Sequence, residues 1–194
     1  MSAGATQSRR TIPVWDVPVR VLHWALVLTV AAAWLTRHSS GRWHEWLGYA
    51  TLAIVAARTI WGFIGSGYAR FADFVRPTSV TIGYARAVFS GREARFVGHN
   101  PLGGWTVVAL LALVALVGLT GWLYTTDRFW GVAWVEALHS TLSDILFLFV
   151  GLHILGVVFT SIRHRENLPR AMLHGRKREN DADKEKGTGS PRLS

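Results

Sequence analysis

The chain has 194 residues, of which 50% are hydrophobic and 17% are charged, and its mean hydropathy is +0.24. Soluble domains usually carry about 25% charged residues, so this composition indicates a membrane protein. The sequence contains no cysteine, which excludes disulfides, thiolate metal sites and the attachment motif of c-type haem. The net charge of +9 is compatible with nucleic acid, anionic lipid or membrane topology, and the positions of the charges decide between them.

Four segments are apolar over the length of about 20 residues that a helix needs to cross a bilayer. They cover residues 17–36, about 46–65, 102–124 and about 138–162, and the third contains no charge. We therefore expect an all-α integral membrane protein, folded as a four-transmembrane-helix bundle. The alternative is a buried core in a soluble protein, but such cores usually show apolar stretches of only about 10–14 residues.

Lysine and arginine are distributed unevenly between the connections. Apart from Arg58, which falls inside the second apolar segment, 17 of them lie near the first segment's start, in the connection between segments two and three, or in the tail. The other two connections hold only 3. The positive-inside rule then predicts that both termini are cytoplasmic. This distribution explains the net charge without nucleic-acid binding.

The remaining segments are expected to be peripheral. Residues 1–12 and 175–194 are polar and charged, so we expect both to be disordered, which leaves 13–174 as the folded membrane domain. In the long connection, Pro77 followed by an amphipathic pattern predicts a short helix on the membrane surface. A signal peptide cleaved near residues 31–33 is the alternative for the first segment, but cleavage would remove His23.

Four of the eight histidines lie in or beside the apolar segments, where ionisable side chains are costly and usually functional. His139 and His153 are fourteen residues apart, which separates them by about 21 Å in depth but only about 40° around a helix. His44 lies near the depth of His139, and His23 near that of His153. Two pairs at two depths suit two stacked haems, because haem iron takes one axial ligand on each face. The alternative is four histidines that only hydrogen-bond between helices.

Arg58 lies fourteen residues after His44, on the same helix face and about 21 Å deeper. A guanidinium at this depth is a suitable partner for a haem propionate. The alternative is that the side chain snorkels to the lipid headgroups. The other histidines fall in connections or in the tail, where a solvated side chain is the simplest expectation: His38, His99, His164 and His174.

Four stretches of the sequence resemble the bacterial cytochrome b561 family, which includes the cytochrome b subunits of nickel–iron hydrogenases. They are VWDVPVRVLHW (14–24), the stretch 43–65 that begins WHEWLGY, GHNPLGGW (98–105), and the stretch 138–172 that begins LHSTLSD. The resemblance covers about residues 13–178. It implies a four-helix membrane bundle that holds two haem b groups and exchanges electrons with quinone.

The resemblance also implies roles for individual residues. His23 and His153 would ligate the cytoplasmic-side haem iron, and His44 and His139 would ligate the periplasmic-side haem iron. Arg58 would contact a propionate. No catalytic residue is expected.

The expected function is that of a multi-pass di-haem b-type cytochrome in the bacterial inner membrane, which moves electrons between the quinone pool and a partner redox protein in a respiratory chain. Candidate partners are a periplasmic c-type cytochrome, a hydrogenase or a dehydrogenase, besides lipid, quinone and a second copy of the chain. Whether the chain is an electron-transfer protein or a subunit of an oxidoreductase complex stays open. The alternatives are a self-contained quinone reductase that oxidises a small molecule such as superoxide, and a haem-free transporter or assembly factor.

Overall fold

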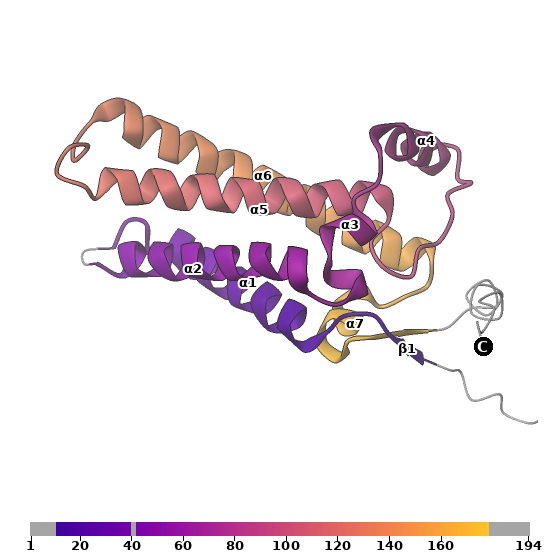
Figure 1. Cartoon of the computed structure of the whole chain (residues 1–194). Helices are drawn as coiled ribbons and strands as arrows, with labels where there is room; N and C mark the ends of the chain where they lie inside the picture. Colours follow the sequence, from indigo (N-terminus) through magenta and orange to yellow (C-terminus); the bar gives the residue numbers. More distant parts are fainter. Residues whose placement is uncertain (1–10, 40–41, 179–194) are drawn as a thin grey trace, which may run out of the picture.

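Four long helices dominate the computed structural model, which describes residues 11–39 and 42–178 (Figure 1). They are α1 (Val17–Thr36), α2 (Trp43–Ile64), α5 (Pro101–Tyr124) and α6 (Ala133–Arg163). Each is long and apolar enough to cross a membrane. The four predicted spans are therefore confirmed, although α2 and α6 begin a few residues earlier than the sequence pattern indicated.

Side-chain caps set the start of two of these helices. Asp16 caps α1, because its Oδ1 accepts a hydrogen bond from the backbone N–H of Val19 at 2.8 Å. Asn100 caps α5 by accepting from the backbone N–H of Gly103 at 2.7 Å, and Pro101 occupies the first turn. Polar residues at the ends of apolar runs thus fix where α1 and α5 begin.

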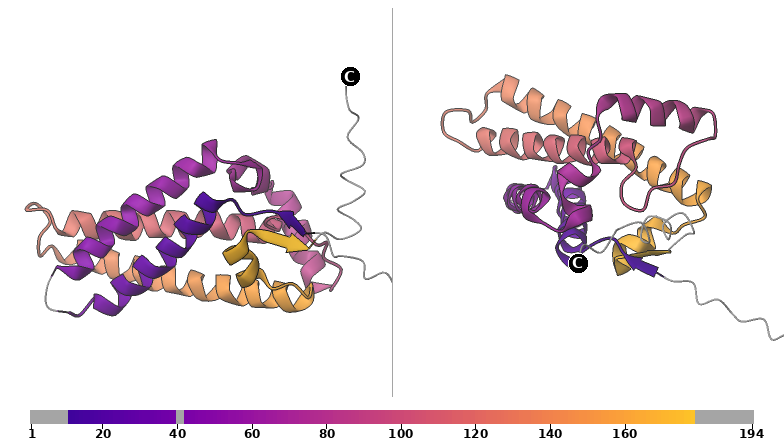
Figure 2. Two further views of the ribbon diagram at one scale, coloured as in Figure 1. Left: turned by 90° about the horizontal axis from the view of Figure 1, so that it is seen from below. Right: turned by 45° about the vertical axis from the view of Figure 1, so that its right-hand side comes forward.

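The four long helices pack as neighbours in the order α1, α2, α5, α6 (Figures 1 and 2). They form two hairpins, α1–α2 and α5–α6, and α2 packs against α5 between them. The buried core is small and is centred on Val55, Val114 and Leu146. Many other apolar side chains of these helices are exposed, as expected for helices that are hydrophobic all round and covered by lipid.

The two ends of the bundle differ. The α1–α2 and α5–α6 connections lie together at one end, which we name the loop end, on the left of Figure 1. The opposite end, which we name the terminal end, holds β1, β2, α7 and the α2–α5 connection. The spans therefore alternate in direction, as a four-span bundle requires.

The α2–α5 connection contains η1 (Gly67–Ala69), α3 (Phe71–Phe74) and α4 (Thr78–Phe89). α4 stands beside α5 and buries none of its residues (Figure 2). The predicted short helix is thus confirmed, and its position at the membrane surface stays a prediction.

A pair of antiparallel strands joins the two ends of the described chain. β1 (Thr11–Pro13) pairs with β2 (Arg176–Arg178), which follows α7 (Leu168–His174). Gly175 makes the turn from α7 into β2 with a φ of +77°, a conformation that favours glycine. Its carbonyl accepts hydrogen bonds at 2.8 and 3.1 Å from the backbone N–H groups of the two residues that follow β1.

This pair is a difference from the sequence analysis, which assigned residues 11–12 and 175–178 to disordered ends. The strands form through backbone contacts between segments at opposite ends of the chain, and local composition does not encode such contacts. The rest of those two segments, residues 1–10 and 179–194, lies outside the described residues.

Candidate functional site

At the loop end, His44 in the first turn of α2 faces His139 of α6. Their ring centroids are 6.1 Å apart and the ring planes are inclined by 86°. Nδ1 of His44 lies 2.8 Å from the backbone oxygen of Ala33, and Nδ1 of His139 lies 3.0 Å from that of Val117. A ring nitrogen that contacts a carbonyl must carry the proton, so Nε2 is the unprotonated nitrogen in both rings.

This spacing suits two imidazoles that bind one metal ion from opposite sides. Because a metal–imidazole bond is about 2.0–2.1 Å long and a ring nitrogen lies about 1.1 Å from its ring centre, two such ligands have centroids about 6 Å apart. Metal-bound histidines also usually donate their other N–H to a carbonyl or carboxylate, as both rings do here. The donor set therefore fits the two axial positions of a haem iron.

α5 provides the surface against which His139 lies. A Cβ built on Gly121 would come within 3.0 Å of Cε1 of His139, so only glycine leaves the ring its full space. Thr120, which is buried, places its Oγ1 3.2 Å from Nδ1 of the same ring. The sequence analysis missed both residues, because the packing of α5 on α6 is not visible in the spacing of either segment alone.

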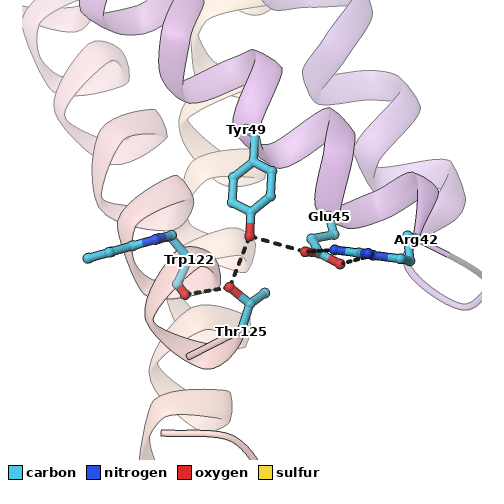
Figure 3. Close-up of polar contacts among 5 residues, drawn as sticks. All are labelled: Arg42, Glu45, Tyr49, Trp122 and Thr125. Carbon is cyan, nitrogen blue, oxygen red and sulfur yellow. Dashed lines mark hydrogen bonds and ion pairs between the residues drawn. The ribbon is translucent and has the colours of Figure 1, made fainter. Parts of the chain in front are cut away.

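A polar network fastens the start of α2 to the end of α5 (Figure 3). Arg42 and Glu45 form an ion pair at 3.0 Å. The hydroxyl of Tyr49 lies 3.1 Å from Oε1 of Glu45 and 3.0 Å from Oγ1 of Thr125. Since His44 belongs to the same turns of α2, this network also holds the backbone that carries it.

At the terminal end, His23 of α1 and His153 of α6 are both partly buried. They lie within electrostatic range of each other. Trp24 packs edge-on against His23, with ring centroids 5.4 Å apart, and its Nε1 is buried without an acceptor among the described residues. Thus α6 places one histidine at each end of the bundle, opposite a histidine of the α1–α2 hairpin.

Arg58 lies near the terminal end of α2 and is only 5% exposed, which disfavours the snorkelling alternative. Its Nη2 is 3.5 Å from the carbonyl oxygen of Ala69, and its guanidinium lies 5.8 Å from the ring centre of Phe71. Its Nη1 is buried, and no described residue accepts a hydrogen bond from it. A buried cation with an unsatisfied N–H is costly, so Arg58 fits a group that carries a carboxylate.

His99 is the residue whose environment the sequence analysis predicted wrongly. It packs between Trp15 and Phe74, with ring centroids 4.7 Å away in each case, whereas a solvated side chain was expected. Its Nδ1 is buried and has no hydrogen-bond partner among the described residues. The cause is tertiary, because the segment before α5 folds back over the end of the bundle. His38 and His174 are exposed, as expected.

Four membrane-spanning helices with histidines of both hairpins at each end form the framework of a membrane-bound haem b protein. A model of the family described as "Prokaryotic cytochrome b561" matches residues 14–175. The chain therefore belongs to this family, and the resemblance inferred from its motifs is confirmed. Membership of this family indicates that the protein is bound to a membrane and transfers electrons through haem b. No curated protein and no solved structure matches the chain significantly.

Proposed function

We propose that the chain is a di-haem b-type cytochrome that passes electrons across the bacterial inner membrane, between the quinone pool and a partner redox protein. One observation carries most of this proposal. His44 and His139, from different hairpins, hold their rings 6.1 Å apart with both Nδ1 atoms against backbone carbonyls. With Nδ1 engaged in both rings, the two Nε2 atoms would be available to hold the iron of a single haem.

His23 and His153 are the proposed ligands of the second haem, and Arg58 is the proposed partner of one of its propionates. When bound, the haems would supply one-electron chemistry at their irons. The protein orients the ring nitrogens, excludes water from them and places a buried positive charge at the terminal end. Along α6, His139 and His153 are separated by about 21 Å in depth, so the two pairs lie toward opposite membrane surfaces.

The distribution of basic residues supports the orientation of this path. Apart from Arg58, 17 lysines and arginines precede or begin the first span, lie between the second and third spans, or follow the fourth, whereas 3 lie in the other two connections. The positive-inside rule then places the terminal end in the cytoplasm. His23 and His153 are accordingly the cytoplasmic-side pair, and His44 and His139 the periplasmic-side pair.

Haem quantification on purified protein tests the proposal. The wild-type chain, expressed with a haem supply, is expected to show a Soret band, a reduced α-band and two haems per chain. His44→Ala and His139→Ala should each lose about half of the haem and leave the other spectrum intact. His38→Ala, at an exposed histidine near the loop end, is the matched control. Absence of a Soret band from the wild type, or full haem content in both variants, overturns the proposal.

Quinone and the redox partner are tested separately. Reduction of the haems by a short-chain quinol in detergent or liposomes is expected if the chain exchanges electrons with the quinone pool. Purification from native membranes should retain a periplasmic c-type cytochrome, a hydrogenase or a dehydrogenase. Haems that a quinol neither reduces nor oxidises contradict the quinone assignment, while the haem sites stand.

A further inference from the structure

Besides Nε1 of Trp24, two buried nitrogen atoms at the terminal end have no hydrogen-bond partner among the described residues. They are Nη1 of Arg58 and Nδ1 of His99. Buried polar atoms in folded proteins are almost always satisfied, and an exception commonly marks the place of a ligand, an ion or a water. Each atom therefore calls for an explanation, and one ligand explains both if they lie in the same region.

A short series of aromatic contacts connects the two side chains. The guanidinium of Arg58 lies 5.8 Å from the ring centre of Phe71. Phe71 lies 5.6 Å from Phe74, which lies 4.7 Å from His99, all between ring centroids. His99 is also within electrostatic range of Arg58 itself. The side chains that carry the two unpartnered atoms thus belong to one region of the terminal end, joined by aromatic contacts.

This region is positively charged and adjoins the second histidine pair. His99 is within electrostatic range of His23 and His153, and also of the buried Lys177. Burial, reinforced by the positive charges of Arg58 and Lys177, lowers the pKa of His99 to about 3. The imidazole is therefore neutral at physiological pH and has one N–H to donate. An anionic acceptor would both receive that N–H and balance the charge of Arg58.

Most carboxylate oxygens of the surrounding elements are already engaged; Glu93 pairs with Arg163 through Oε1, and its Oε2 is buried without a partner among the described residues. Asp16 accepts hydrogen bonds from the backbone of Val19 and from the side chains of Trp61 and Ser66. Glu166 is paired with two cations of the same end, Arg95 and Lys177. An acceptor for Arg58 and His99 is thus more readily supplied by a bound group.

We infer that Arg58 and His99 together bind one propionate of the haem that His23 and His153 hold, an inference that rests on the proposed function. Nη1 of Arg58 and Nδ1 of His99 each donate one hydrogen bond to that carboxylate. The segment before α5 is then part of the haem site, in addition to the spans that carry the ligands.

Redox titration and resonance Raman spectroscopy of the haem-loaded protein test this inference. His99→Leu removes the N–H, so the propionate charge is less compensated and stabilises ferric iron. We expect a lower midpoint potential for one haem, an unchanged potential for the other, and a shifted propionate bending mode. His174→Leu, at an exposed histidine of the same end, is the control and should change neither. A His99→Leu protein with both potentials and the propionate mode unshifted overturns the inference.

A pair of polar variants decides the question if His99→Leu fails to fold. The amide nitrogen of asparagine falls near the position of Nδ1, whereas that of glutamine falls near Nε2. His99→Asn should therefore keep the wild-type potential and propionate mode, and His99→Gln should shift both. Identical behaviour of the two variants counts against the inference.

A double-mutant cycle tests whether the two residues share one carboxylate. The cycle compares the wild type, Arg58→Gln, His99→Gln and the variant that carries both substitutions. Residues that bind the same group couple, so the two shifts in potential should be non-additive. Additive shifts overturn the shared site. Wild-type protein without haem would instead refute the proposed function itself, so the two failures are distinguishable.

Discussion

Trp61, near the end of α2, donates a hydrogen bond from Nε1 to Oδ2 of Asp16 at 3.0 Å. The other carboxylate oxygen of Asp16 caps α1 through the backbone N–H of Val19. The hydroxyl of Ser66, in the turn that follows α2, also donates to Oδ2. A single carboxylate therefore joins the start of the first span to the end of the second.

Substitution of Asp16 should destabilise this junction in two separable steps. Asp16→Ala removes the cap and leaves Trp61 without its acceptor, and we expect a loss of about 2–3 kcal/mol in the free energy of unfolding. Asp16→Asn keeps a good cap but accepts the other hydrogen bonds less well, so about 1 kcal/mol is expected. Thermal unfolding in detergent, followed by circular dichroism, measures both. Equal stability of Asp16→Ala and wild type would contradict the structural role.

The same carboxylate should make stability depend on pH in the acid range. Partial burial raises the pKa of Asp16, but hydrogen bonds from Ser66, Val19 and Trp61 and the charge of Arg58 outweigh it and leave the pKa below the ordinary 3.8. The stabilisation is thus complete above pH 3.8 and is lost as the pH falls through the lower folded-state pKa. The unfolding temperatures of wild type and Asp16→Asn should converge below that pH. A difference that stays constant with pH argues against this account.

Gly121 should be required for the orientation of His139. A larger side chain would press on the imidazole, since even a Cβ would lie 3.0 Å from Cε1. Gly121→Val is expected to lower the haem content by about half, because only the loop-end site is disturbed. Gly151→Val, at an α6 glycine with no atom within 4 Å of a built Cβ, is the control. Full haem content in Gly121→Val would show that the ring tolerates displacement.

Tyr49→Phe should loosen the attachment of α2 to α5. The variant loses the hydroxyl that contacts Glu45 and Thr125, and a loss of about 1 kcal/mol in unfolding free energy is expected. Urea or thermal unfolding in the same detergent measures it, with Tyr68→Phe at an exposed tyrosine as control. The network is not stabilising if the two variants unfold alike.

Gly175→Ala should release β2 from β1. A positive φ destabilises alanine by about 1–2 kcal/mol. Its Cβ would also lie 2.6 Å from the backbone oxygen of Trp15. Gly131→Ala is the control, because Gly131 also has a positive φ, +72°, but lies at the loop end, with open space around a built Cβ. Trypsin should cleave β2 faster in Gly175→Ala than in Gly131→Ala. Equal cleavage rates would show that Gly175→Ala does not release β2.

The spans could be predicted from the sequence because a continuous apolar run is a local property. Helix periodicity then gives depth and face, which is why His139 and His153 could be assigned to opposite ends of one helix before any coordinates. The first turns of α2 and α6 were missed because they lie at the membrane boundary, where Trp43 stands among polar neighbours and Glu136 interrupts the apolar run.

Other features depend on contacts between distant segments. The enclosure of His99 requires Trp15 and Phe74 to meet on either side of it, and these residues come from different parts of the chain. The space that Gly121 leaves for His139 likewise arises from the packing of two helices. Hydrophobic patterning carries no information about contacts between distant segments, so neither the enclosure of His99 nor the role of Gly121 could be predicted.

The division of the histidines between the hairpins bears on how the chain is made. α1 and α2 leave the ribosome first with His23 and His44, but the histidines that face them belong to α6. Under the proposed assignment of the haem ligands, neither haem site would be complete until the last span is synthesised and inserted. Cofactor capture is thus a late event in biogenesis, and a chain cut between α2 and α5 would regain it only when its halves reassociate.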